Sequence, residues 1–293
     1  MTVMTTTAQY SYGIDGWYLG NTKQNSTAAS PKASNVTAAV TYTSKGTRTL
    51  RSYTIAYSAG TGVSSVSRTS ETVNYGANAA GSTATQAADT AQYAYTWDGW
   101  YTAATGGTRV STSKTYAPTS ITGAATYYAR CTATTRSYTI TATAQYRNTD
   151  GTGDYTTGTT GGTASGGGSG NYGTTKALTA VAATGYTFDG WYNSSGTRVS
   201  TSTSYSPTIT GAATYYARFT KIYYTITYNK GSYIASVSRA SERVAYNANA
   251  LGSTATPTAT TAEFSYSFSK WTVSTESGST ASTSATYAPT AVK

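Results

Sequence analysis

The chain has 293 residues and a net charge of +10, yet charged residues make up only 10%, against about 25% in ordinary soluble domains. It contains no histidine and a single cysteine, which excludes an internal disulfide, a cysteine-rich zinc site and the most common general base. The ten carboxylates are dispersed and no catalytic motif is present, so we predict a protein that is not an enzyme and holds no cofactor or metal.

The composition favours β-structure. Tyrosine and threonine suit a half-buried pleated surface, and glycine and serine mark turns, whereas strong helix formers such as Leu, Met and Glu are scarce. No run approaches the roughly 20 apolar residues of a membrane span, so membrane insertion is not expected. The basic residues form no dense run; they either keep the surface soluble or favour an anionic polymer, and nucleic acid is not an expected partner.

Internal repetition is the strongest signal along the chain. The first marker is a turn-like Asp-Gly-Trp, and we expect each aspartate to cap its own turn rather than to form an acid–base pair. It stands at Asp15–Trp17, Asp98–Trp100 and Asp189–Trp191, and in altered form at Ser269–Trp271.

A second marker, Tyr-Thr-Ile, sets the period. It begins at Tyr53, Tyr138 and Tyr224, at spacings of 85 and 86 residues. The run from Val66 to Tyr75 recurs from Val237 to Tyr246, which is 171 residues or two periods further on. We therefore predict a tandem array of about 85-residue repeats.

The repeat phase gives four segments. We predict an incomplete N-terminal repeat over 1–49, repeat two over 50–135, repeat three over 136–220 and an incomplete C-terminal repeat over 221–293. Within a repeat, side chains alternate with the period of two that is typical of strands, as in Tyr53–Tyr57 and Tyr127–Cys131. Cys131 falls on the buried face, so we interpret it as a small core residue. A short helical turn after Tyr75 or Tyr246 remains open.

Repeat three departs from the pattern. It lacks the strand that contains Val66-Ser67-Arg68 in repeat two and has instead a Gly-rich stretch that includes Ser165–Gly170. We interpret this stretch as a flexible surface loop or as a binding loop on a rigid scaffold. Nearby, Asn148–Asp154 carries closely spaced oxygen ligands; it is either a calcium loop without its terminal Glu or an Asx-type turn.

The combined motifs resemble a known family. The sequence Phe-Asp-Gly-Trp-Tyr, then Gly-Thr-Arg-Val, then Tyr-x-Pro, then Tyr-Tyr-Ala-Arg-Phe-Thr resembles the Listeria–Bacteroides repeat, the B-repeat of internalin-type surface proteins. The final strand stands at Tyr127–Cys131 and Tyr215–Phe219. The resemblance implies small all-β modules, β-grasp-like or of small β-sandwich type, in tandem on bacterial surface proteins. It implies a stalk, spacer or adhesive role and no catalytic residues.

One face of the final strand carries a repeated Tyr/Arg pair. Tyr128 and Arg130, and Tyr216 and Arg218, lie opposite the inferred core. Amphipathic aromatics suit contact with sugars or proteins, so these four residues are candidate surface contacts for a cell-surface glycan or another anionic polymer. The alternative is a cross-strand aromatic ladder that stabilises the sheet.

The two end repeats lack complementary parts. Residues 1–49 lack the opening strands, and the fourth repeat lacks a Tyr-Tyr-Ala-Arg strand after Tyr287-Ala288-Pro289. Unpaired edges invite pairing with another chain, so donor-strand complementation would give head-to-tail self-association and an extracellular filament. The alternative is a fragment of a longer array.

Three functions follow as expectations. The first is a structural or cell-adhesion protein at the bacterial cell surface, with the fibre as its assembled form. The second is a phage virion appendage such as a head or tail fibre, favoured because Met1–Tyr10 does not read as a signal peptide. The third is a carbohydrate-binding module, favoured by the exposed tyrosines.

Overall fold

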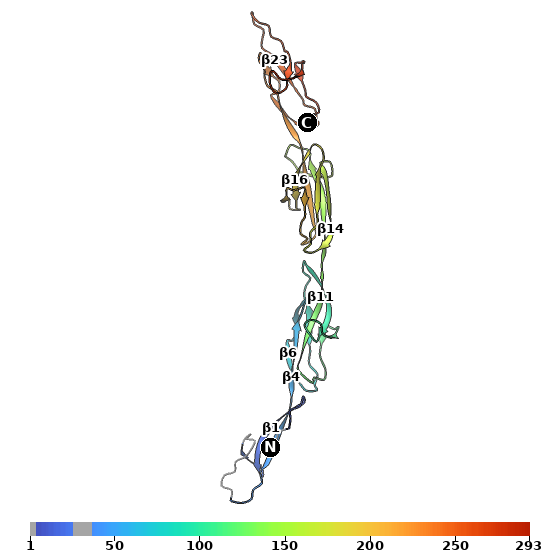
Figure 1. The fold of residues 1–293 in the computed structure, drawn as a ribbon, viewed down its shortest axis with the longest axis vertical. Coiled ribbons are helices and arrows are strands. Elements are labelled where there is room, and N and C mark those ends of the chain that lie inside the picture. Colours follow the sequence, from blue (N-terminus) through green and yellow to red (C-terminus); the bar gives the residue numbers. More distant parts are fainter. Residues whose placement is uncertain (1–3, 26–36) are drawn as a thin grey trace. The chain divides into compact units, whose positions relative to one another are not determined.

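A computed structural model describes residues 4–25 and 37–293, which form β-strands and turns without any helix. The predicted all-β fold is thereby confirmed, and the turns after Tyr75 and Tyr246 are not helical. The chain divides into two compact units, Met1–Arg136 and Ser137–Lys293 (Figure 1).

The first unit opens with a three-stranded antiparallel sheet. Its order is β2-β1-β3, from β1 (Tyr10–Leu19), β2 (Thr22–Asn25) and β3 (Thr43–Leu50). In the sequence, Val36–Thr47 is a weaker copy of the run that ends in Tyr-Tyr-Ala-Arg, and it lies partly outside the described residues. A single residue, Arg51, connects β3 to β4 (Ser52–Ala59). The Arg51 backbone N–H donates to the Gln9 carbonyl at 2.9 Å, and its guanidinium donates to the Thr7 carbonyl at 2.8 Å.

Repeat two is a module of two sheets. The larger sheet has the order β6-β4-β11-β8-β9, in which β4 and β11 are parallel neighbours, and β4, β6 and β11 lie together in Figure 1. The smaller sheet has the order β10-β7-β5. Beside β4, the strands are β5 (Val63–Val66), β6 (Ser70–Asn74), β7 (Ser82–Gln86), β8 (Tyr93–Tyr101), β9 (Arg109–Ser111), β10 (Thr115–Tyr116) and β11 (Ala125–Thr135).

The core of repeat two lies between these sheets. Ile55, Trp100 and Ala129 are fully buried in it, and Tyr57 and Cys131 are nearly so. The tyrosine and tryptophan rings meet edge to face at 5.8 Å. The predicted buried position of Cys131 is correct, and burial raises the pKa of its thiol.

The Asp-Gly-Trp marker is not a turn. It lies inside β1, β8 and β16 (Tyr186–Tyr192), where the strand register shifts by one residue as a β-bulge. Gly99 adopts φ +148°, and a Cβ there would collide with the Ser111 carbonyl oxygen, so the bulge requires glycine. The aspartate does not cap a turn either: Asp98 accepts from the Tyr101 hydroxyl at 2.8 Å and pairs with Arg109 at 3.2 Å.

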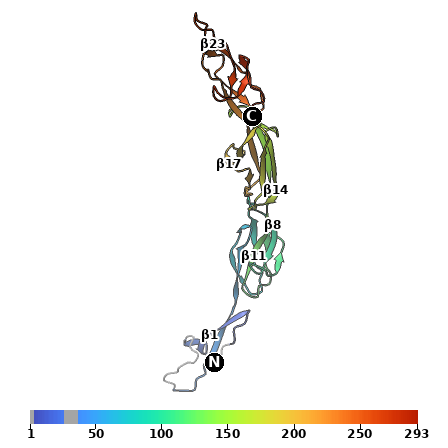
Figure 2. The same ribbon diagram turned by 45° about the horizontal axis from the view of Figure 1, so that its top comes forward.

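Repeat three combines its strands into one larger sheet. The order is β17-β16-β19-β12-β14-β15-β18, with β13 paired to β12 and with β12 parallel to β19. Figure 2 labels two strands of this sheet, β14 and β17. Beside β16, the strands are β12 (Ser137–Arg147), β13 (Thr156–Thr157), β14 (Gly162–Asn171), β15 (Leu178–Ala182), β17 (Arg198–Ser200), β18 (Ser204–Tyr205) and β19 (Ala213–Lys221).

The Gly-rich stretch is a strand, so its interpretation as a flexible loop is wrong. β14 pairs with β15 through its first half and with β12 through its second half, and it thus makes the pairings that β5 and β6 make separately in repeat two. The passage from one pairing to the other needs backbone that only glycine adopts easily. Gly166 and Gly167 have φ of +91° and +85°, and a Cβ would collide with the carbonyl oxygen of Ala177 at the first and of Ile140 at the second.

Repeat four has the same opening strands but smaller sheets. β20 pairs with β22, β23 lies between β21 and β26, and β24 pairs with β25. The strands are β20 (Tyr223–Thr227), β21 (Ile234–Val237), β22 (Ser241–Ala245), β23 (Ser253–Pro257), β24 (Trp271–Thr272), β25 (Thr280–Ser282) and β26 (Thr286–Tyr287).

Candidate strand-binding groove in the fourth repeat

The first halves of repeats two and four share one polar network. The Tyr57 hydroxyl donates to Glu71 Oε1 at 2.8 Å, and the backbone N–H groups of Ala80 and Gly81 donate to the same carboxylate at 2.9 and 2.8 Å. In repeat four, Tyr228, Leu251 and Gly252 donate to Glu242, each at 2.8 Å. The network fastens the third strand of the repeat, β6 or β22, to the loop that follows it.

Hydrogen bonding determines the charge state of this glutamate. Burial acts to raise the pKa of Glu71, but the N–H groups of Ala80 and Gly81 and the Tyr57 hydroxyl outweigh it, so the pKa lies below its ordinary value. Burial and the carboxylate together raise the pKa of Tyr57 far above its ordinary value. The pair is therefore a neutral phenol donating to an ionised carboxylate, and the same holds for Tyr228 and Glu242.

The second half of repeat four is open. In repeat two, β11 lies between β4 and β8, but among the described residues β20 has only β22 as a neighbour. Residues 263–270 of repeat four correspond in sequence to β8 of repeat two, but they form no strand. A cavity of about 1020 Å³ lies between these two segments. We call it the open groove; its lining includes Ile226, Tyr228, Lys230, Phe268, Trp271 and Tyr287.

Aromatic rings form the floor of the open groove. Trp271 meets Tyr228 edge to face at 5.9 Å and Phe268 at 6.0 Å, and the first of these contacts reproduces the Tyr57–Trp100 contact of repeat two. In repeat two, Tyr127 of β11 covers this floor: its ring stacks on Tyr57 at 6.3 Å. Among the described residues, no β11 equivalent covers the floor in repeat four, so the open groove has the surface that a final strand of the repeat would bury.

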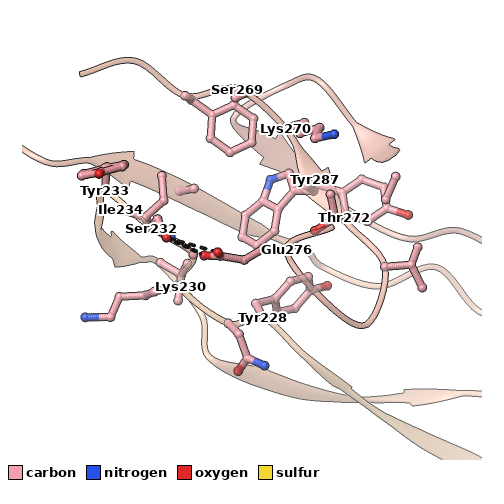
Figure 3. Close-up of a pocket in the computed structure, with 18 of the residues that line it drawn as sticks. Tyr228, Lys230, Ser232, Tyr233, Ile234, Ser269, Lys270, Thr272, Glu276 and Tyr287 are labelled. Atoms are coloured by element: carbon pink, nitrogen blue, oxygen red, sulfur yellow. Dashed lines mark hydrogen bonds between the residues drawn. The ribbon is translucent and has the colours of Figure 1, made fainter. Parts of the chain in front are cut away.

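One polar contact narrows the mouth of the open groove. Figure 3 shows Glu276, from the turn between β24 and β25, bonded to Ser232, from the turn after β20. The Ser232 hydroxyl is 3.1 Å from both carboxylate oxygens, and its backbone N–H also donates to Glu276. Lys230 and Lys270 flank the same opening (Figure 3).

The four predicted surface residues lie in two places, one in each unit. Tyr128 and Arg130 are on β11, and Tyr216 and Arg218 are on β19. The Arg130 guanidinium stacks 3.9 Å from the Tyr101 ring centroid and donates to the carbonyls of Ala103 and Gly106. Contact with a glycan stays a prediction, but these interactions show that Arg130 also stabilises its own repeat.

Arg218 has a similar place in repeat three. Its guanidinium lies 4.3 Å from the Tyr192 centroid and 4.7 Å from the Tyr155 centroid, and its Nε donates to Gln145 at 3.0 Å. Tyr155 in turn donates to Asp189 at 2.6 Å. The long hairpin between β12 and β14 thus supplies a second ring, which has no counterpart among the contacts of Arg130 described above.

The Asn148–Asp154 segment contacts repeat four. The Asp150 carboxylate pairs with Arg243, and the Tyr223 hydroxyl donates to the Asn148 carbonyl at 2.6 Å. No cluster of three His, Cys, Asp or Glu residues with metal-binding geometry occurs within residues 4–25 and 37–293. Those same residues contain no helix with the length and apolar character that crossing a membrane requires.

The open groove could be foreseen only in part. The absence of a Tyr-Tyr-Ala-Arg strand in repeat four predicts unpaired edges, but the cavity and its aromatic floor are visible only in three dimensions. A further signal in the sequence is the recurrence of Tyr57 and Glu71 as Tyr228 and Glu242. Repeat three has Ala142 and Gly168 at the matching places.

Comparison with known proteins bears on repeat three. Residues 155–223 match the family described as the divergent InlB B-repeat domain. Neither the curated proteins nor the solved structures gave a match to this chain. The matched segment runs from the hairpin after β12 to the start of β20, and it confirms the resemblance of this segment to the Listeria–Bacteroides B-repeat.

Proposed function

We propose that the chain is a structural surface protein without enzymatic activity, in which B-like repeats form an extracellular spacer that associates head-to-tail into a fibre. The B-repeat match supports the surface and structural part of this proposal, because the family is typical of extracellular or surface proteins. The fibre is the finer part and rests on the geometry of repeat four.

The direct junctions between repeats support the spacer. Ile222 alone connects β19 to β20, as Arg51 alone connects β3 to β4. The Ile222 N–H donates to the Gly185 carbonyl at 2.8 Å, and its own carbonyl accepts from Tyr246 at 2.8 Å. Arg51 makes the equivalent pair of bonds with Gln9 and Tyr75. A junction of one residue with both backbone groups bonded leaves little freedom to bend, which suits a spacer.

The observation that carries the fibre is the open groove. It presents the unpaired edge of β20 above an aromatic floor, and unpaired strand edges bind further strands. A head-to-tail contact that does not close on itself yields an open filament.

Cryo-electron microscopy of the purified chain near neutral pH tests this function. We expect regular filaments in which the repeats are stacked along the axis, and a sedimentation coefficient that rises with protein concentration. Isolated single chains at all concentrations would overturn the fibre and leave the spacer, and hydrolytic or transferase activity in the pure chain would overturn the structural role.

A further inference from the structure

We propose that repeat three binds the carboxylate or sulfate groups of an acidic polysaccharide on a sheet face formed by Arg147, Arg218, Tyr155 and Tyr192. We call these four residues the arginine site. The site adds a ligand to the proposed spacer. All of its residues belong to one repeat of one chain, so it does not depend on the fibre.

The arginine site lies on the two parallel strands at the centre of repeat three. Arg218 of β19 stands opposite Gln145 of β12, and Arg147 of β12 stands opposite Thr220. Because side chains two residues apart on a strand point to the same face, both arginines lie on one face of the sheet. Ala217, the residue before Arg218, is fully buried in the core, so the arginines are on the outer face.

Two tyrosine rings hold the guanidinium groups in place. The Tyr155 ring centroid is 4.7 Å from the Cζ atom of Arg147 and 4.7 Å from that of Arg218, and the Arg218 Cζ atom is 4.3 Å from the Tyr192 centroid. Stacking uses the flat face of a guanidinium and leaves its N–H donors, which point outward in the plane, for hydrogen bonds. The rings therefore orient both groups before any ligand arrives.

Both arginines keep terminal donors unused within the described residues. The Nε of Arg147 donates to Thr220 at 2.8 Å, and the Nε of Arg218 donates to Gln145 at 3.0 Å. Neither arginine makes another hydrogen bond or an ion pair in this part of the chain. The Nε bonds fix the stem of each planar fork and leave its two outer nitrogens, which suit an oxyanion.

The neighbouring carboxylates leave this charge uncompensated. Asp189 accepts from the hydroxyls of Tyr155, at 2.6 Å, and of Thr220. Burial and the bond to Asp189 raise the pKa of Tyr155, which therefore stays a neutral donor. In the hairpin before β13, Asp150 already has an ion-pair partner, and Asp154 is exposed, so solvent screens its charge. An oxyanion bound between the two guanidinium groups would relieve their mutual repulsion.

Repeat two uses the equivalent arginine for its own structure. Arg130 stands opposite the bulge glycine as Arg218 does, but one of its terminal nitrogens donates to the carbonyls of Ala103 and Gly106. These carbonyls belong to the turn over residues 102–108 between β8 and β9. The corresponding turn of repeat three spans residues 193–197, and it makes no hydrogen bond to Arg218 among the described residues.

Repeat two also lacks the second arginine. The first strands of the two repeats align at Ile55 and Ile140, which each stand opposite the start of a final strand. In this alignment Gly62 takes the place of Arg147, and Gly60 takes that of Gln145. The proposal therefore predicts binding at repeat three and not at repeat two.

An acidic polysaccharide fits the arginine site better than a nucleic acid does. Bases stack on exposed aromatic faces, whereas Tyr155 and Tyr192 already carry guanidinium groups. Tyr216 stands opposite Tyr192 and on the same face of β19 as Arg218, and its half-buried ring extends the site with an amphipathic surface that suits a sugar. The net charge of +10 favours approach of a polyanion.

Titration calorimetry of the full chain tests the site with an oligouronate, a sulfated oligosaccharide and a neutral oligosaccharide of equal length. We expect at least one acidic ligand to bind, with an affinity that falls as salt rises, and the neutral ligand not to bind. The acidic ligand that binds more tightly identifies carboxylate or sulfate as the preferred group. Absence of binding by both acidic ligands, or equal binding of the neutral one, would overturn the proposal.

Arg147→Gln is the main variant, because it removes one charged fork and keeps a side chain that can still donate to Thr220. We expect its affinity for the acidic ligand to fall about tenfold or more. Arg147→Lys keeps the charge without the planar fork and should recover only part of the loss. The matched control Arg130→Gln removes the same charge from repeat two and should leave the affinity nearly unchanged. The thermal midpoint of each variant shows whether its fold is intact.

Full affinity in Arg147→Gln, or an equal loss in Arg130→Gln, would reduce the binding to general charge attraction and overturn the site. If Arg147→Gln unfolds, Arg147→Lys decides in its place, and full affinity in that variant overturns the planar fork as the binding group. Displacement of the ligand by single-stranded DNA of the same charge at equal concentration would assign the site to nucleic acid. Sedimentation of the same samples measures the fibre separately, since Arg147 lies outside repeat four.

Discussion

Repeats two and four begin with the same strands and the same Tyr–Glu network, yet only repeat two closes into a complete sheet. Thr90–Trp100 and Thr261–Trp271 are similar in sequence, and both start with a turn in which the threonine N–H donates to the carbonyl three residues on. In repeat two this stretch becomes β8, which has nine residues; in repeat four only Trp271–Thr272 is a strand. Because the local sequences are so alike, the difference lies in the partner: β11 organises β8, and no described strand does so for residues 263–270.

Replacing the central tryptophan of repeat two or of repeat four should give the largest difference in stability loss between the two repeats. Trp100 is fully buried, whereas Trp271 forms part of the floor of the open groove and is 9% exposed. We expect Trp100→Ala to cost about 3–5 kcal/mol in repeat two and Trp271→Ala to cost less in repeat four, because part of its surroundings is already cavity. Hydrogen exchange of β4 and β20 measures the two local stabilities. Equal losses would show that the final strand does not determine how firmly the tryptophan is held.

The bulge glycine gives the next effect. Gly99→Ala places a Cβ against the Ser111 carbonyl in a backbone conformation that alanine avoids, and we expect a loss of about 2–3 kcal/mol. The equivalent of Gly99 in repeat four is Lys270, where no bulge forms, so Lys270→Ala should leave stability unchanged. Urea denaturation followed by tryptophan fluorescence distinguishes the two. Insensitivity at Gly99 would contradict the bulge as a required feature.

As the pH falls, we expect repeats two and four to lose stability at a higher pH than repeat three. The lowered pKa values of Glu71 and Glu242 mean that the folded state favours their ionised forms. This contribution to stability is fully present above the ordinary glutamate pKa of about 4.3, and it is lost as the pH falls through the lowered values. Repeat three has Ala142 and Gly168 in place of the pair and lacks this sensitivity.

Hydrogen exchange at decreasing pH, corrected for the intrinsic rate, should show loss of protection in β6 and β22 while β14 keeps it. Glu71→Gln serves as the control, because it should weaken β6 at neutral pH and abolish the acid dependence there. Simultaneous loss in all three strands would assign the acid transition to other groups.

The smallest effect concerns the contact between the Asn148–Asp154 segment and repeat four. Asp150 and Arg243 form an ion pair whose side chains are 42% and 49% exposed, so solvent and salt screen it. We expect Asp150→Asn to cause only a slight drop in the thermal midpoint, which disappears in high salt. A large drop in the thermal midpoint would mean that the Asn148–Asp154 segment is needed to stabilise the fold of repeat four.

Sequence alone predicts what depends on local pattern and fails where distant strands decide. The period, the all-β class and the buried place of Cys131 follow from spacing and alternation. The loop interpretation of Ser165–Gly170 fails because glycine is a poor strand former by itself; the two neighbours β12 and β15 supply the pairing that makes it a strand. The turn interpretation of Asp-Gly-Trp fails because a bulge and a turn both favour glycine, and only the opposing strand distinguishes them.

The candidate groove could be predicted as an unpaired edge and no further. The missing Tyr-Tyr-Ala-Arg strand indicates which pairing is absent, but the volume of the cavity and the meeting of Tyr228 with Trp271 depend on strands more than 40 residues apart in the chain. Alternation places the Tyr/Arg pairs on one face of their strand. The stacking of the arginines on Tyr101 and Tyr192 comes from the neighbouring strand, which alternation does not reveal.

The parallel pairing of the first and last strands determines how a repeat bears tension. When the two ends of repeat two are pulled apart, β4 and β11 slide along each other, so the five residue pairs from Ile55–Ala125 to Ala59–Ala129 resist together in shear. Repeat three has eight such pairs, from Ile140–Ala213 to Arg147–Thr220, and should yield at a higher force. Among the described residues β20 has no parallel neighbour, so in this part of repeat four no strand pair resists tension in shear.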